Sequence, residues 1–133
     1  MSRVTFGLLI AAQAAHSIEE YVGRLWESFA PAAFMVGLVS SDPERGFIII
    51  NCAFVAFGFW CLLWPIRRGW PSATFFAWLW VVIEGMNGIG HMAWSVLQRA
   101  YTPGVLTAPI LLVLALYLAS RLQKSALSKE AWS

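Results

Sequence analysis

Four long apolar segments constrain this 133-residue chain more than any other feature of its sequence. They cover approximately residues 4–25, 46–66, 71–97 and 103–122. A helix needs about 20 predominantly apolar residues to cross the hydrocarbon core of a bilayer, and each segment meets that length. The composition agrees, because only 12% of the residues are charged, whereas a soluble domain has about 25%. The segments therefore predict an integral membrane protein made of helices.

Short polar connections separate these segments and predict how the helices are arranged. Arg67–Pro71 is a tight connection between the second and third segments. Thr102 and Pro103 are typical of an N-cap followed by proline in the first turn of the fourth helix. Because short connections favour antiparallel neighbours, we expect an all-α fold, a four-helix transmembrane bundle.

The membrane domain is predicted to cover residues 1–124, and residues 125–133 are predicted to form an exposed tail. The apolar stretch 30–39 is too short to span, so we expect an interfacial segment or an extension of the first helix. The first segment has the arginine and small residues of a signal peptide. Its dense polar cluster predicts instead that it is retained.

The basic residues predict the orientation of the bundle. Six fall on the side of the two termini and three on the other side, where acidic residues accompany them. Because basic residues concentrate on the cytoplasmic side, we expect both termini in the cytoplasm. The expected location is a bacterial plasma membrane. The six are Arg3, Arg67, Arg68, Arg121, Lys124 and Lys129, and the three are Arg24, Arg45 and Arg99.

Ionisable side chains within the first predicted span are the first functional signal. His16, Glu19 and Glu20 have the spacing i, i+3 and i+4, which places them on one face of a helix. A charge at the bilayer centre costs at least about 2.5–3.5 kcal/mol, so such groups need partners. Glu20 and Arg24, at i and i+4, have the spacing of an ion pair. A purely structural polar network is the alternative to a functional site.

The third predicted span carries a second set of polar residues. Glu84, Asn87 and His91 have the spacing i, i+3 and i+7, which keeps them within an arc of about 60°. Asn51 lies near the start of the second span and Thr107 near the start of the fourth. In an antiparallel bundle, all these groups meet in one layer, roughly 7–12 Å below the non-cytoplasmic surface. We therefore expect one site in that half of the membrane.

The polar residues carry a resemblance to a known family. The run His16-Ser17-Ile18-Glu19-Glu20 resembles the defining motif of the HXXEE domain family, small integral membrane proteins of unknown function. Asn87-xxx-His91 and Tyr101-x-Pro103-Gly104-xx-Thr107 are similar to the two other signatures of that family, in the same order. The resemblance covers about residues 8–122, and it implies no reaction.

The residue types predict a membrane-embedded enzyme that acts on a lipid-like or isoprenoid substrate. Imidazoles and carboxylates are the ligands of zinc, iron or manganese. We expect His16, Glu19, Glu84 and His91 to bind such a metal ion. Glu19 is favoured over Glu20 because Arg24 can pair with Glu20, and Glu20 remains the second choice of ligand.

Other residues are predicted to support catalysis and to contact the substrate. The predicted catalytic residues are Glu20, Glu84 and Asn87, and the predicted substrate-binding residues are Asn51, Tyr101 and Thr107. A metal-free acid–base isomerase or cyclase using the same His and Glu residues is the first alternative. A non-enzymatic binding or ion-carrying subunit is the second. The expected partners are membrane lipid and a lipid-like small molecule, and an oligomer is compatible with the sequence. The net charge of +2, without a basic run interleaved with aromatics, argues against nucleic acid.

Overall fold

The fold is all-helical over residues 3–130, the part of the chain that this computed structural model describes. Three of its helices are long and apolar enough to cross a membrane, over Pro43–Ile66, Ala73–Gln98 and Ala108–Leu127, which is consistent with a membrane protein. The first helix, α1 (Arg3–Val22), lies alongside them but is not among the three. A fourth span and the cytoplasmic orientation of the termini stay predictions.

The first of these three candidate spans joins α4 (Pro43–Cys61) to a π-helical turn, η1 (Leu62–Ile66). Asp42 caps α4, because its carboxylate accepts the backbone N–H groups of Glu44 at 3.1 Å and Arg45 at 3.3 Å. Proline at the first helical position removes a donor that would have no partner there. The π-helical turn contains Pro65, whose missing N–H interrupts the regular helical hydrogen bonds.

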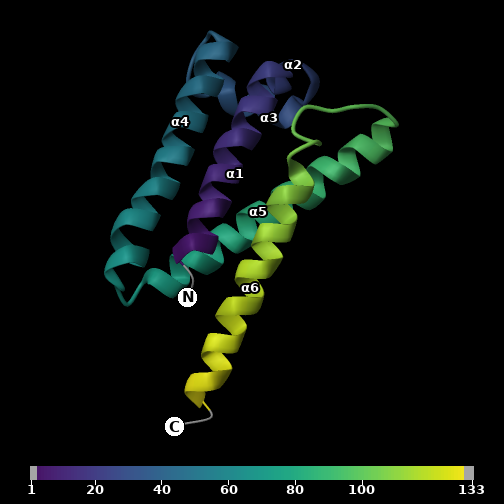
Figure 1. Cartoon of the computed structure of the whole chain (residues 1–133). Helices are drawn as coiled ribbons and strands as arrows, with labels where there is room; N and C mark the ends of the chain where they lie inside the picture. Colours follow the sequence, from purple (N-terminus) through teal and green to yellow (C-terminus); the bar gives the residue numbers. More distant parts are fainter. Residues whose placement is uncertain (1–2, 131–133) are drawn as a thin grey trace.

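The remaining long helices are α5 (Ala73–Gln98) and α6 (Ala108–Glu130). The start of α1 and the end of α6 lie at the same end of the molecule as the connection between η1 and α5 (Figure 1). The predicted fourth segment begins at Pro103, whereas α6 begins at Ala108. The residues between them form turns, and the backbone N–H groups of Leu106 and Thr107 donate to the Glu19 carboxylate of α1.

Two short helices, α2 (Leu25–Ser28) and α3 (Ala30–Gly37), cover one end of the bundle (Figure 1). The stretch 30–39 is therefore a separate element and not an extension of the first helix. The chain leaves α1 through Arg24, which takes a left-handed conformation with φ of 52°. Val36 of α3 packs with Phe47 of α4 in a small apolar cluster.

The main apolar core lies between α1, α5 and α6, towards the end that holds the start of α1. Phe6, Trp80 and Leu118 are fully buried there. Phe6 meets the Trp80 ring edge-on, with ring centroids 6.4 Å apart. The polar residues of α1 and α5 lie further along the same helices, beyond this apolar layer. The core thus brings the two polar faces together at one level.

Candidate functional site

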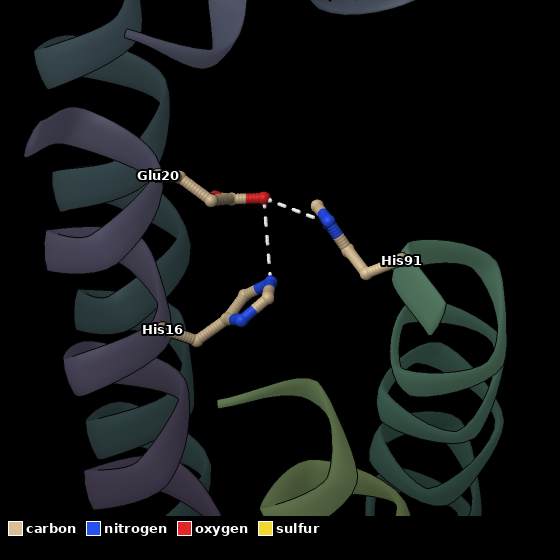
Figure 2. Close-up of side chains that lie close together, drawn as sticks. All are labelled: His16, Glu20 and His91. Atoms are coloured by element: carbon tan, nitrogen blue, oxygen red, sulfur yellow. Dashed lines mark ion pairs between the residues drawn. The ribbon is translucent and has the colours of Figure 1, made fainter. Parts of the chain in front are cut away.

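Three buried side chains converge where α1 faces α5 (Figure 2). Glu20 Oε1 lies 3.3 Å from Nε2 of His16 and 3.0 Å from Nε2 of His91. The two imidazole rings meet edge to face, with centroids 4.7 Å apart and planes at 84°. Each residue is less than a tenth exposed, so little solvent reaches these groups.

The spacing of these atoms is suited to a metal ion. One ligand atom from each of His16, Glu20 and His91 lies within 4.8 Å of the other two. Metal–ligand bonds to His nitrogen or carboxylate oxygen are about 2.0–2.2 Å long, so ligand atoms around one ion lie at most about twice that distance apart. A small contraction would therefore bring all three atoms onto one ion.

Gly104 forms the wall behind the two imidazoles. Its φ of +95° is a backbone conformation that residues with a Cβ rarely adopt. A Cβ built on Gly104 would lie 2.6 Å from His91 Nδ1 and 2.8 Å from His16 Cε1. Both the backbone conformation and the contact with the rings therefore require glycine.

Glu19 points away from this cluster and binds the segment between α5 and α6. Its carboxylate accepts the backbone N–H groups of Leu106 at 3.0 Å and Thr107 at 2.9 Å. It also accepts the hydroxyls of Thr107, at 2.5 Å, and Tyr101, at 3.1 Å. Desolvation and this contact with Glu19 raise the pKa of Tyr101. Glu19 thus holds the start of α6 against α1.

Thr107 connects Glu19 to the buried cluster. Its Oγ1 lies 2.7 Å from Nδ1 of His16, the imidazole nitrogen that faces away from Glu20. The Glu19 carboxylate, the Thr107 hydroxyl and the His16 imidazole therefore form one continuous chain of hydrogen bonds. The structure places Thr107 behind His16, and its predicted contact with substrate stays a prediction.

Glu84 lies on the same helix as His91 but outside the cluster of His16, Glu20 and His91. Its side chain is fully buried beside Gln13 of α1. With its Nε2 turned towards Glu84, the Gln13 amide donates to Oε2 at 2.9 Å and to Oε1 at 3.2 Å. Asn87, on the same helix, lines a groove together with His91.

Asn51 holds α4 against α1 and does not reach the cluster. Its Oδ1 accepts the Ser17 hydroxyl at 2.8 Å, and its Nδ2 donates to the carbonyl oxygen of Phe47 at 3.2 Å. Ser17 and Asn51 lie in the wall of an apolar groove of about 480 Å³ between the two helices. Asn51 therefore lies apart from the cluster of His16, Glu20 and His91.

A family model of proteins of unknown function with an HXXEE motif matches residues 7–118 of this chain. The chain belongs to the HXXEE family. No curated protein and no solved structure matches it. The HXXEE motif itself is divided by the structure: His16 and Glu20 face His91, whereas Glu19 faces the start of α6.

Two contributors to this HXXEE site were not predicted as site residues. Gly104 contacts both imidazoles, and its place in the Tyr101–Thr107 signature, three residues before Thr107, was the available signal. Gln13 lies one turn before His16 on α1, and helical spacing alone places it on the polar face. Its contact with Glu84 depends on how α1 packs on α5, which spacing does not provide.

Proposed function

We propose that this protein is a membrane-embedded, metal-dependent enzyme that acts on a lipid-like or isoprenoid substrate. His16, Glu20 and His91 are the proposed ligands. The observation that carries the proposal is the convergence of three buried ligand atoms, from two helices, within 4.8 Å of one another. A buried charge costs several kcal/mol unless it is paired, so a chain that keeps these groups in an apolar bundle has a use for them.

The number and types of ligands favour a catalytic site over a structural one. Two imidazoles and one carboxylate form the ligand set of several catalytic zinc sites and of mononuclear iron oxygenases. Structural zinc sites use four protein ligands, whereas catalytic sites keep one position for water or substrate. The ion would supply a Lewis acid or an activated water molecule there. Zinc, iron and manganese all suit these ligands.

A groove beside His91 supports an apolar substrate. It has a volume of about 310 Å³, at the lower end of the range for small-molecule sites. Its walls are mostly apolar, with the Asn87 amide and the His91 imidazole as the polar groups. The groove lies along the membrane-spanning helix α5, where lipid is the surrounding solvent. The lining residues are Phe29, Met86, Asn87, Gly90, His91, Ala93, Trp94 and Leu97.

In this proposal each polar residue near the ligand cluster and the groove has its own role. His91 connects the proposed ligand cluster to the groove, since it belongs to both. Asn87 can hydrogen-bond a polar group of the substrate at the same end of the groove. Glu84, which is also on α5, is a buried carboxyl outside the ligand cluster. It is the candidate to hold a proton. Asn51 and Tyr101 hold elements of the fold together and Thr107 contacts His16, and contact of these residues with substrate stays a prediction.

A metal-free acid–base enzyme is the second candidate. It is favoured by one contact: Glu20 Oε1 and His91 Nε2, 3.0 Å apart, already satisfy each other as a hydrogen-bonded pair. A carboxylate and an imidazole in this arrangement can move a proton to and from a substrate in the groove. Both candidate functions use His91 and Glu20, so a measurement of metal binding is needed to distinguish them.

Metal titration of the purified full chain in lipid nanodiscs tests the proposal. The protein is stripped with chelator and titrated with Zn²⁺, Fe²⁺ or Mn²⁺ under conditions that keep each ion reduced and soluble. We expect one equivalent to bind to the wild type and none to bind stoichiometrically to Glu20→Gln. Glu27→Gln is the matched control, because Glu27 is exposed and paired with Arg24. Equal binding by both variants would reject Glu20 as a ligand.

A further inference from the structure

The hydroxyl of Thr107 lies between a carboxylate, which can only accept a hydrogen bond, and an imidazole nitrogen, which can donate or accept one. It is 2.5 Å from Oε2 of Glu19 and 2.7 Å from Nδ1 of His16. A threonine hydroxyl has one proton to donate and lone pairs that accept. It can therefore donate to only one of these two neighbours, and the other bond needs a proton from elsewhere.

The surroundings of Glu19 decide the direction of both bonds. Its carboxylate already accepts two backbone N–H groups and the Tyr101 hydroxyl, so it acts as an acceptor. An ionised carboxylate has no proton to give, so Thr107 donates to Glu19. The lone pairs of Thr107 Oγ1 are then directed to His16, and the bond between them requires a proton on Nδ1 of His16.

The other nitrogen of His16 fits this assignment. Nε2 lies 3.3 Å from Glu20 Oε1, yet it makes no hydrogen bond within the described residues 3–130. A neutral imidazole with its proton on Nδ1 has a lone pair on Nε2. That lone pair faces the place where Glu20 and His91 converge.

We infer that Glu19 and Thr107 form a relay that fixes the tautomer of His16. The relay keeps the proton on Nδ1 and directs the Nε2 lone pair at the proposed metal position. This inference deepens the proposed function and rests on it for its purpose, since a metal binds the unprotonated nitrogen of a neutral imidazole. Glu19 and Thr107 are thus positioning residues, and they act on the metal through His16.

A purely structural role for the same residues is the competing explanation. Glu19 also binds the backbone at the start of α6, so replacing Glu19 would disturb both the relay and the fold. Thr107→Val separates the two roles, because it removes the hydroxyl and leaves the backbone N–H groups of Leu106 and Thr107 on Glu19. Thr107→Ser restores a hydroxyl, and Tyr101→Phe removes another donor to Glu19 that does not touch His16.

The test is ¹⁵N NMR of the histidine rings in metal-free full-length protein in nanodiscs. His91→Gln identifies the His16 signals. We expect the Nδ1–H tautomer in the wild type, in Thr107→Ser and in Tyr101→Phe, and a loss of this preference in Thr107→Val. An Nε2–H tautomer in the wild type would overturn the inference, and so would a Thr107→Val spectrum like that of the wild type. The wild-type spectrum decides even if Thr107→Val does not fold.

Metal affinity provides the second readout. It distinguishes failure of the proposed metal-dependent function from failure of the relay. Loss of the partner that orients a metal-bound histidine costs about 10- to 100-fold in affinity. We expect a loss of that size in Thr107→Val and recovery in Thr107→Ser. The Nδ1–H tautomer without metal binding would reject the proposed function alone. Metal binding unchanged by Thr107→Val would reject the relay alone.

Discussion

Replacing Gly104 by alanine tests how closely the loop before α6 packs on the two imidazoles. The new Cβ would lie 2.6 Å from His91 Nδ1, whereas ordinary contacts begin at 3.4 Å, so the atoms must separate by 3.4 − 2.6 = 0.8 Å. Forced overpacking of this kind costs roughly 1–3 kcal/mol. The left-handed backbone conformation of Gly104 adds roughly 1–2 kcal/mol for a residue with a Cβ.

Gly69→Ala is the matched control for this substitution. Gly69 also has a positive φ, of +66°, but a Cβ built there meets no atom within 4 Å. We therefore expect Gly69→Ala to pay the backbone cost of roughly 1–2 kcal/mol and Gly104→Ala about 2–5 kcal/mol. Thermal unfolding of both variants in the same detergent measures the difference.

Metal affinity should respond to Gly104→Ala and not to Gly69→Ala. Protein–metal distances are held within about 0.2 Å, and a ring displaced by several tenths of an ångström no longer fits. We expect weaker metal binding by Gly104→Ala at temperatures where it is fully folded. If the two alanine variants are equally stable and bind metal equally well, the loop does not support the imidazoles as described.

Three further outcomes are expected. Gly46→Ala should lower thermal stability and leave metal affinity unchanged, because its Cβ would lie 2.5 Å from the Val36 carbonyl oxygen and would meet none of the three proposed ligands; equal melting temperatures would contradict this packing. Arg24 lowers the pKa of Glu27, so this pair stabilises the fold above the ordinary glutamate pKa and is lost as the pH falls through the lowered value. Thermal stability measured against pH should therefore show this contribution in the wild type and lack it in Glu27→Gln. A cysteine reporter at Ser133 should resist labelling from outside intact cells if the termini are cytoplasmic.

Helical spacing predicted which residues of α1 and α5 share a face. His16 and Glu20 are one turn apart within α1, and His91 lies on the face of α5 that meets them. The convergence of these faces follows from apolar residues elsewhere on the same helices, such as Phe6 and Trp80. These parts of the site were therefore predictable from the sequence.

The choice between Glu19 and Glu20 could not be predicted by spacing, because it depended on where α1 ends. Glu20 and Arg24 would pair if the helix continued, and that pairing favoured Glu19 as the ligand. The structure ends α1 at Val22, and Arg24 pairs with Glu27 at 2.6 Å. Glu20 is therefore free to lie between the imidazoles.

The segment between α5 and α6 was the least predictable part. Its residues form turns with no helical period, and their positions depend on hydrogen bonds to Glu19, far away in the sequence. The positive φ of Gly104 and the contact of Thr107 with His16 both arise from this packing. Local pattern therefore placed Thr107 near the site but did not predict that it lies behind His16.

The most direct test of the central claim is the metal content of the protein purified without chelator, combined with an anomalous-scattering map of its crystals. We expect one transition-metal ion per chain, within bonding distance of His16 Nε2, Glu20 Oε1 and a nitrogen of His91. Glu20→Gln provides the control for a peak that arises elsewhere. Protein without stoichiometric metal, or a metal peak away from these three atoms, would contradict the claim.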